Sequence, residues 1–207
     1  HLVEKLLEQG RAVRVLALKK PFEPIEVSNF KIIKNKGAGI VYGDLRDKDS
    51  LSSAVRGVKT VFHLGAISRP MAIRPHVYWD INSRGTKNIL EASQAAGVKK
   101  FVHVSTVSVL GGSLDGHPLK EDDYQQGLGP YAISKLTAEH LALGFYQKHN
   151  LSVVMIRPCL IYGPRCLPRL VMFKYVKKSL FPIFNGGRAK MEFCYVGNLV
   201  QSLLLAE

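Results

Sequence analysis

The chain has 207 residues, a formal net charge of +13, 46% apolar residues and 22% charged residues. This length and balance suit one globular domain with a sizeable core and part of a second lobe. No apolar run approaches the roughly 18 residues of a membrane span, and the three cysteines lack the paired spacing of a zinc site or a disulfide framework. We therefore expect no membrane span and a reduced, cytoplasmic setting.

The excess of positive charge is strongest between residues 165 and 190, where seven Lys or Arg residues occur without an Asp or Glu. Such a field attracts nucleic acid, an anionic membrane or a phosphorylated substrate, and it also suits a solvated basic face. The chain contains no recognisable nucleic-acid-binding module. We therefore expect a small-molecule substrate and no nucleic acid partner.

Helical and strand patterns alternate along the chain. The amphipathic stretches predict helices and the apolar, β-branched runs predict strands. In chain order these are helix 1–9, strand 12–18, strand 39–42, helix 47–55, strand 60–64, helix 78–96, strand 100–104, helix 130–149 and strand 151–156.

Several residues mark the helix ends. Gly10, Gly57 and Gly97 each follow a predicted helix and are expected to be C-terminal glycines. Asp47 or Asp49 is expected to cap the second helix.

The remaining segments are less regular. Residues 19–36 are expected to lack a helix because Pro21 and Pro24 break it. Helical patterns return at residues 169–178 and 198–207.

The alternation of elements predicts the fold class. Nearly continuous apolar strands separated by helices indicate a parallel sheet covered on both faces. Right-handed crossovers then give a doubly wound, Rossmann-like α/β fold. In that fold a strand and a glycine-rich turn precede the first helix, whereas this chain begins inside a helical pattern. We therefore expect the fold to be truncated before its first strand.

Tyr131 and Lys135 open the long amphipathic stretch at residues 130–149. A separation of four residues places both on one helical face, about one turn apart. An adjacent ammonium favours a phenolate and lowers the tyrosine pKa from its usual value of about 10. The pair therefore indicates an acid/base couple, and a surface helical pair is the alternative.

Hydroxyl side chains follow the strand at residues 100–104. Ser105 and Thr106 stand at its carboxyl end, where open α/β sheets bind ligands. Either hydroxyl could hold a substrate oxygen beside Tyr131, and we favour Thr106. The alternative is that both only satisfy backbone groups.

These residues resemble the extended short-chain dehydrogenase/reductases, also called the NAD-dependent epimerase/dehydratase family. The resemblance covers essentially the whole chain. Besides the two segments above, it rests on segments at residues 43–47, 61–66, 82–86 and 157–164, in the family's order. It implies an enzyme that moves hydride between a nicotinamide and a substrate alcohol.

The resemblance implies roles for individual residues. Tyr131 would be the acid/base, Lys135 its electrostatic partner and a ribose ligand, and Thr106 the hydroxyl on the substrate oxygen. The implied cofactor contacts are Asp44 to the adenine amino group, Leu45 on the adenine ring, Leu64, Gly65 and Ala66 along the dinucleotide, Asn82 as an anchor between helix and sheet, and Pro158 beside the nicotinamide. Asp44 as a turn residue and Gly65 as a packing residue are the alternatives.

Three further residues suggest other chemistry. His63 and His103 lie in apolar strands, and we expect them to pack in the core or beside the cofactor rather than bind a metal. Cys159 follows Pro158, but nothing in its context indicates a nucleophile.

The choice of cofactor depends on the second strand of the family's fold. NAD-using members usually carry an acid at its end, where this chain has Ala17 followed by Lys19 and Lys20. A lysine could pair with a 2′-phosphate, although both could simply be solvated. We expect NAD or NADP, with a slight lean to NADP.

The substrate class depends on the segment after the last strand. Nucleotide-sugar members tend to carry Asn where this chain has Leu160, whereas the Arg157-Pro158 form resembles the 3β-hydroxysteroid dehydrogenase-like branch. We expect an oxidoreductase acting on a hydrophobic, steroid-like compound. One alternative is a nucleotide-sugar epimerase or dehydratase that recycles its cofactor, since the basic stretch at residues 165–190 would suit a diphosphate. The other alternative is a non-catalytic protein that senses the dinucleotide.

The resemblance also implies the domain organisation. Residues 1–158 would form an NAD(P)-binding domain lacking its first strand and glycine-rich turn. Residues 159–207 would form part of a substrate-side lobe and a returning helix. A homodimer through the helices at residues 78–96 and 130–149 is a further implication.

Overall fold

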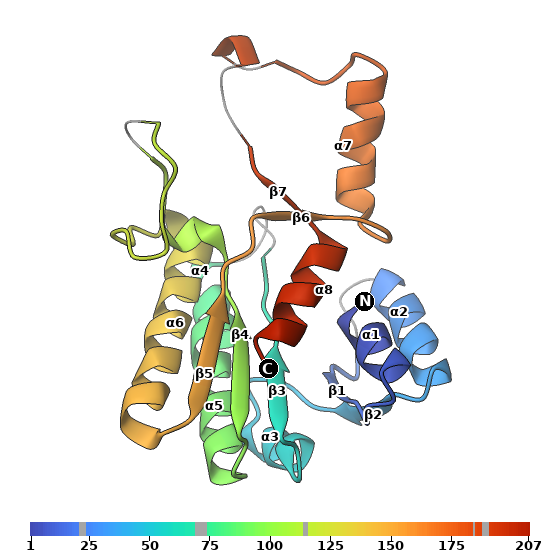
Figure 1. Cartoon of the computed structure of the whole chain (residues 1–207), viewed down its shortest axis with the longest axis vertical. Coiled ribbons are helices and arrows are strands. Elements are labelled where there is room, and N and C mark those ends of the chain that lie inside the picture. Colours follow the sequence, from blue (N-terminus) through green and yellow to red (C-terminus); the bar gives the residue numbers. More distant parts are fainter. Residues whose placement is uncertain (21–23, 69–73, 114–115, 184, 188–190) are drawn as a thin grey trace.

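The computed structural model describes residues 1–20, 24–68, 74–113, 116–183, 185–187 and 191–207 (Figure 1). The elements in chain order are α1 (Leu2–Glu8), β1 (Arg14–Ala17), α2 (Pro24–Asn35), β2 (Gly39–Tyr42), α3 (Lys48–Val55), β3 (Thr60–His63), α4 (Pro75–Tyr78), the π-helix η1 (Trp79–Arg84), α5 (Gly85–Ala95), β4 (Lys100–Val104), the 3₁₀ turn η2 (Val107–Val109), α6 (Gly129–His149), β5 (Ser152–Ile156), β6 (Leu160–Tyr162), α7 (Leu167–Lys177), the 3₁₀ turn η3 (Asn185–Gly187), β7 (Phe193–Tyr195) and α8 (Val196–Leu205).

The strands form parallel sheets, which confirms the predicted α/β class. Strands β3, β4 and β5 pair in that order, β1 pairs with β2, and β6 pairs with β7. In the described residues no hydrogen bond joins β1 to β3, so these two strands belong to separate sheets.

Helices cover both faces of the β3–β4–β5 sheet, as expected for a doubly wound fold (Figure 1). Phe101 and Val102 are neighbours on β4, and both are fully buried. Phe101 packs among residues of α3, α5 and α6, whereas Val102 packs among residues of α1 and α8. Because successive strand residues point to opposite faces, one strand supplies the core on both sides.

The predicted helix ends are confirmed. Gly10, Gly57 and Gly97 have φ values of 73°, 71° and 70°, in the left-handed region that follows helix ends. Of the two candidate caps of α3, Asp47 takes the role, because its Oδ1 accepts from the backbone N–H groups of Asp49 and Ser50.

The expectation that residues 19–36 lack a helix is wrong. Helix α2 begins at Pro24 and continues to Asn35. Proline is tolerated in the first turn of a helix, where its missing N–H group has no intrahelical partner. Pro24 therefore starts this helix rather than breaking it, while Pro21 lies outside the described residues.

The segment predicted as one helix at residues 78–96 is interrupted. A six-residue π-helix, η1, lies between α4 and α5. π-helical turns widen a helix and are frequent at functional sites. This one carries Asn82 and Ser83, which are both buried.

Residues beyond 158 form an extended arm and a returning helix. None of the described residues of α7 is buried, and α7 stands away from the β3–β4–β5 sheet (Figure 1). Its Phe173 ring contacts Tyr162 of β6 and Phe193 of β7. Helix α8 returns to the body, where Leu199 and Leu203 pack with Leu2, Leu6 and Val102. The division into domains at residue 158 remains a prediction.

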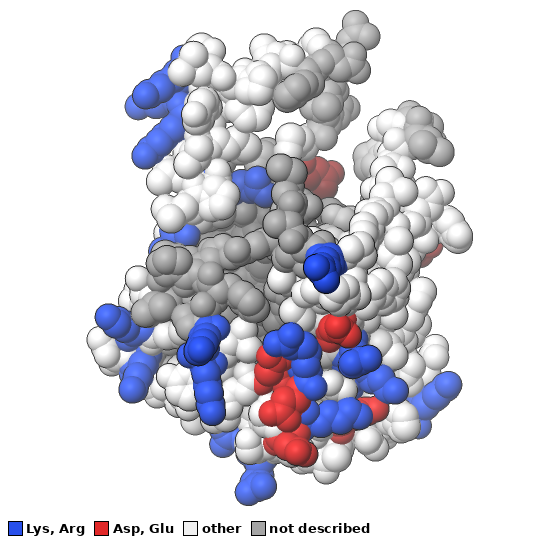
Figure 2. Space-filling view, turned by 180° about the vertical axis from the view of Figure 1, so that it is seen from behind, with Lys and Arg blue, Asp and Glu red and all other residues white. Residues whose placement is uncertain are grey.

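The face opposite to that in Figure 1 carries interspersed acidic and basic side chains in its lower part (Figure 2). Ion pairs between acidic and basic surface side chains include Asp44–Arg46, Lys48–Glu91 and Asp80–Arg84. Within the described residues, no helix is both long and apolar enough to cross a membrane.

Candidate active site

Helix α6 carries Tyr131 and Lys135 on one face, with Tyr131 in its first turn. The side chain of Lys135 is buried, and its Nζ donates to the carbonyl oxygen of Val104 at 2.7 Å. Val104 is the last residue of β4. This bond therefore fixes the start of α6 against the carboxyl end of the central strand.

The residues that follow β4 bring a hydroxyl to Tyr131. The Thr106 side chain lies near enough to the Tyr131 phenol to lower its pKa. Its Oγ1 also accepts from the Ser108 N–H group at 3.2 Å. The Ser105 hydroxyl is buried and has no hydrogen-bond partner among the described residues. Of the two predicted hydroxyls, the structure therefore pairs Thr106 with Tyr131.

The electrostatics of Tyr131 differ from the expectation. Burial raises the pKa of the phenol above its usual value, the neighbouring Thr106 side chain lowers it, and Tyr78 raises it. The Tyr78 and Tyr131 rings meet edge to face, with centroids 6.2 Å apart. The predicted lowering by Lys135 is not seen, because the Lys135 ammonium is directed to Val104 and burial is the larger effect.

Burial also changes Lys135 itself. It lowers the pKa of the amine from 10.5 to about 8, and the carboxylate of Glu139 opposes that shift. A buried amine pays for desolvation of its charged form, which explains the direction. Lys135 therefore changes charge near physiological pH.

Asn82 joins the π-helix to the segment after β3 and to α6. Its Oδ1 accepts from the Ile67 N–H group at 2.8 Å, and its Nδ2 donates to the Ile67 carbonyl at 3.0 Å. Nδ2 also donates to Ser134 Oγ at 3.0 Å. The fully buried amide thus makes three hydrogen bonds to two segments and ties them to the π-helix.

The end of β3 offers an exposed strip of backbone. Leu64, Gly65 and Ala66 are all exposed, although they follow a strand whose last residue is buried. A Cβ atom at Gly65 would lie 3.2 Å from Leu45 Cδ1. Glycine at position 65 therefore lets the Leu45 side chain pack close to this strip.

Asp44 follows β2, but its carboxylate is largely occupied. Arg46 donates to it from Nε at 2.9 Å, from Nη2 at 2.6 Å and from the backbone N–H group at 2.9 Å. This pairing lowers the pKa of Asp44. A carboxylate has about four acceptor positions, so about one remains for a ligand.

Pro158 lies beside the strand-end hydroxyls. Its carbonyl oxygen accepts from the Val107 N–H group at 3.2 Å. Pro158 is therefore adjacent to the segment that contains Thr106.

His63 and His103 pack in the core, as expected. Their rings stack with centroids 5.4 Å apart, and Nε2 of His63 lies 2.9 Å from Thr86 Oγ1. Neither ring nitrogen of His103 has a partner among the described residues. Burial lowers the pKa of His63 to about 3 and that of His103 well below 6.5.

We expect these histidines to make the protein sensitive to acid. Between pH 6.5 and about 3 the unfolded chain binds protons at these positions and the folded protein does not. Stability should therefore fall with decreasing pH by up to about 1.4 kcal/mol per pH unit for each histidine. Urea unfolding of the full-length protein at several pH values in this range measures the slope.

In the variant His63→Gln, the slope of unfolding free energy against pH should decrease by the contribution of about one proton. The exposed His140 serves as the control, and His140→Gln should leave the slope unchanged. Equal slopes in wild type and His63→Gln would contradict this account.

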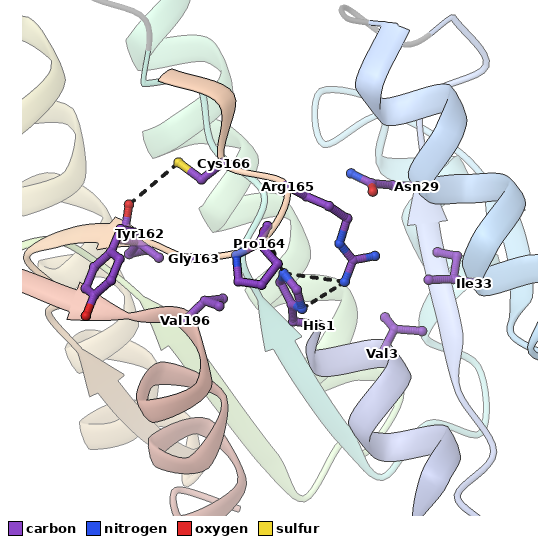
Figure 3. A pocket seen from close by; sticks show the side chains of 11 residues that line it. His1, Val3, Asn29, Ile33, Tyr162, Gly163, Pro164, Arg165, Cys166 and Val196 are labelled. Atoms are coloured by element: carbon purple, nitrogen blue, oxygen red, sulfur yellow. Dashed lines mark hydrogen bonds between the residues drawn. The ribbon is translucent and has the colours of Figure 1, made fainter. Parts of the chain in front are cut away.

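A cavity of about 340 Å³ lies away from Tyr131, between the helices α1 and α2 and the segment around β6 (Figure 3). Arg165 Nη2 lies 2.8 Å from His1 Nδ1 and also pairs with Glu4. Neither Thr106 nor Tyr131 lines this cavity. It is therefore separate from the candidate active site.

Sequence reasoning missed three contributors to the site. Tyr78 contacts the Tyr131 ring, Ser134 receives the Asn82 amide, and Glu139 pairs with Arg157. Only Glu139 carried a sequence signal, because it lies one helical turn beyond Lys135.

A parallel sheet in which Thr106 follows the central strand, beside Tyr131 and the buried Lys135 of α6, defines a dehydrogenase-like α/β protein. The sequence model of the NAD dependent epimerase/dehydratase family matches residues 1–206. The chain therefore belongs to the NAD-dependent epimerase/dehydratase family.

Relatives act in two chemical contexts. The chain is 32% identical to the sterol-4-alpha-carboxylate 3-dehydrogenase (decarboxylating) of Homo sapiens, over 100% of this chain and 53% of that protein. It is 32% identical to the N-acetyl-alpha-D-glucosaminyl-diphospho-ditrans,octacis-undecaprenol 4-epimerase of Escherichia coli O157:H7, over 77% of this chain and 48% of that protein. It thus spans about half the length of these curated relatives.

A solved structure shows the same fold. The UDP-glucuronic acid 4-epimerase of Bacillus cereus, in complex with UDP-glucuronic acid and NAD, superposes with a TM-score of 0.86 and 26% identity. The match covers 100% of this chain and 68% of that one.

Proposed function

We propose that the protein is an NAD-dependent oxidoreductase that interconverts a substrate alcohol and ketone, with Tyr131, Thr106 and Lys135 as its catalytic residues. The observation that carries the proposal is that Thr106, at the carboxyl end of β4, lies beside Tyr131 on α6, while Lys135 bonds to the Val104 carbonyl at the same strand end. Lys135 lies one turn along α6 and is buried beneath them.

The residues around this set fit a dinucleotide. Leu64, Gly65 and Ala66 form an exposed strip that a dinucleotide could follow. A Cβ atom at position 65 would crowd the Leu45 side chain beside this strip. The remaining acceptor position of Asp44 suits an adenine amino group, with Leu45 beside it. Asn82 holds the strip's neighbour Ile67 by its hydrogen bonds. Pro158 would border the nicotinamide, which supplies or accepts the hydride when bound.

Each catalytic side chain then has a defined task. Tyr131 transfers the proton of the substrate hydroxyl, and Thr106 holds the same oxygen by a hydrogen bond. Lys135 holds the start of α6 against the end of β4 through the Val104 carbonyl and would bind the cofactor ribose. Because burial raises its pKa, Tyr131 is protonated at neutral pH and has a proton to donate to a ketone.

For the cofactor we propose NAD. The family and the solved relative that contains NAD support this choice. The lean to NADP rested on Lys19 and Lys20, which are exposed after β1, and the comparisons do not support it.

For the substrate we propose a hydrophobic, steroid-like alcohol. The sterol dehydrogenase relative supports this class, and Leu160 stands where nucleotide-sugar members carry an amide. The exposed apolar residues of α7, which include Leu170, Val171 and Phe173, supply an apolar surface on the substrate side. The second candidate is a nucleotide-sugar epimerase or dehydratase, favoured by the structural match to a UDP-sugar enzyme.

We expect a substrate panel to separate the two candidates. The full-length protein would be incubated with NAD and either hydroxysterols or UDP- and GDP-sugars, and reduced cofactor would be followed by its absorbance. Sterol oxidation should give net NADH, because an oxidoreductase releases the reduced cofactor. A sugar converted without net NADH would replace the proposed function with the second candidate, and NADP in place of NAD tests the cofactor choice.

The assembly and setting of the protein are also proposals. We propose a homodimer through α5 and α6, since Ile133, Leu143 and Tyr146 on α6 are exposed apolar residues. The free cysteines Cys159 and Cys194 suit the reducing cytoplasm.

A further inference from the structure

We propose that Arg157 is a positioning residue that holds Thr106 and Tyr131 in register through its ion pair with Glu139. This proposal rests on the proposed function, because it concerns the same catalytic pair. Arg157 touches neither Tyr131 nor Thr106 in the described contacts, so its effect is exerted through the elements to which it binds.

The Arg157 guanidinium joins three segments of the chain. It donates to Glu139 from Nε at 2.9 Å and from Nη2 at 2.8 Å, in a two-pronged contact. Its Nη1 donates to the Glu121 carbonyl at 2.6 Å, in the loop between β4 and α6. Side-chain exposure is 15% for Arg157 and 2% for Glu139, so this ion pair lies inside the protein.

The residues on either side of Arg157 hold the segment that contains Thr106. The Ile156 carbonyl accepts from the Ser105 N–H group at 2.7 Å, and the Pro158 carbonyl accepts from the Val107 N–H group at 3.2 Å. Arg157 therefore lies between two backbone bonds that fix the neighbours of Thr106. A shift of its backbone would move the threonine hydroxyl.

The partner carboxylate lies on the helix of Tyr131. Glu139 is one turn beyond Lys135 and two turns beyond Tyr131, so the three share a helical face. The ion pair thus connects the strand end that places Thr106 to the helix that places Tyr131. A planar guanidinium with two parallel bonds resists both sliding and rotation of α6 against β5.

Stability alone is a weak explanation for this pair. Removing one partner of a buried ion pair is strongly destabilising, whereas replacing both by apolar residues of similar volume is often neutral. The double variant Arg157→Met with Glu139→Leu can therefore keep the fold while it removes the connection. This difference allows positioning to be tested separately from folding.

In the full-length protein we expect the double variant to keep the wild-type melting temperature and to bind NAD with a Kd within about two-fold of wild type. Its kcat should fall about 30- to 100-fold while KM changes less than about three-fold, because misplacement of reacting groups by about 1 Å costs rate rather than binding. In Arg157→Lys, which keeps the charge but loses the two-pronged contact, kcat should fall about ten-fold. The exposed pair Lys48–Glu91 provides the control, and Lys48→Met with Glu91→Gln should leave kcat unchanged.

A second measurement does not depend on turnover. Titration of the Tyr131 phenol by NMR of ring-labelled tyrosine, assigned with Tyr131→Phe, reports the contact with Thr106. Because the nearby Thr106 side chain lowers the phenol pKa, separation of the two residues in the double variant should raise the pKa further. If the wild-type protein oxidises no alcohol but the pKa of Tyr131 is higher in the double variant, the proposed function fails. The positioning role of Arg157 is then still supported.

A folded double variant with wild-type kcat and an unchanged titration would overturn the proposal. Equal losses of kcat, NAD affinity and melting temperature would also overturn it, since they would show a structural role only. If the double variant does not fold, Arg157→Lys carries the test by the same two measurements.

Discussion

Replacing Tyr131 with phenylalanine should lower the turnover of the full-length protein about 10³-fold, within the range that general acid–base groups contribute. The phenylalanine ring keeps the edge-to-face contact with Tyr78, and only the hydroxyl is lost. The NAD Kd should therefore stay within about two-fold of wild type. Steady-state kinetics and cofactor titration measure the two effects.

The pH dependence of the wild type should support the same assignment. Burial raises the pKa of Tyr131, so the side chain is a phenol at neutral pH. Ketone reduction, which needs a proton donor, should be fast at neutral pH, whereas alcohol oxidation should accelerate as the pH rises. Tyr146 on the same helix is exposed, and Tyr146→Phe is the control. Wild-type turnover in Tyr131→Phe would remove Tyr131 from the mechanism.

Replacing Lys135 with methionine should lower turnover by about 10² or more and should stabilise the protein at neutral pH. Turnover falls because the bond that holds Tyr131's helix against the end of β4 is lost, together with the proposed contact to the cofactor ribose. The folded pKa of Lys135 is about 8, against 10.5 in the unfolded chain. The difference of 2.5 units corresponds to about 3 kcal/mol of destabilisation at pH values below 8.

The pH window follows from the direction of that shift. Between pH 8 and 10.5 the unfolded chain binds more protons than the folded protein, so wild-type stability rises with pH through this interval. The lost bond to the Val104 carbonyl costs about 1–2 kcal/mol and offsets part of the gain. Lys135→Met should therefore be about 1–2 kcal/mol more stable than wild type at pH 7, and this advantage should disappear above pH 10.

Denaturant unfolding at pH 7 and pH 10.5 measures this change. Lys148 lies on the same helix and is exposed, so Lys148→Met is the matched control and should show neither effect. A Lys135→Met protein that is less stable than wild type at pH 7 would contradict the account of a buried, desolvated amine.

Features set by local spacing could be predicted from the sequence. The four-residue step from Tyr131 to Lys135 fixes their common face once the helix forms, and the strand before Thr106 fixes where its hydroxyl emerges. The choice of Asp47 over Asp49 as the cap of α3 required the backbone geometry. The preference for Thr106 over Ser105 was already predicted from the sequence, and the structure places the Thr106 side chain near Tyr131.

Features set by distant packing could not be predicted. Arg157 and Glu139 are far apart in sequence, and their pairing depends on burial between β5 and α6. The effect of Lys135 on Tyr131 was mispredicted because spacing gives no information on desolvation. Helix α2 was missed because Pro24 was interpreted as a breaker, although the first turn of a helix accepts proline.

The most direct test of the central claim is a crystal structure of the full-length protein with NAD and a substrate alcohol or its ketone. We expect the substrate oxygen to lie within about 3.2 Å of both Tyr131 Oη and Thr106 Oγ1. A substrate oxygen that contacts neither hydroxyl, while the nicotinamide lies within reach of the substrate carbon, would contradict the assignment of Tyr131 and Thr106 as catalytic residues.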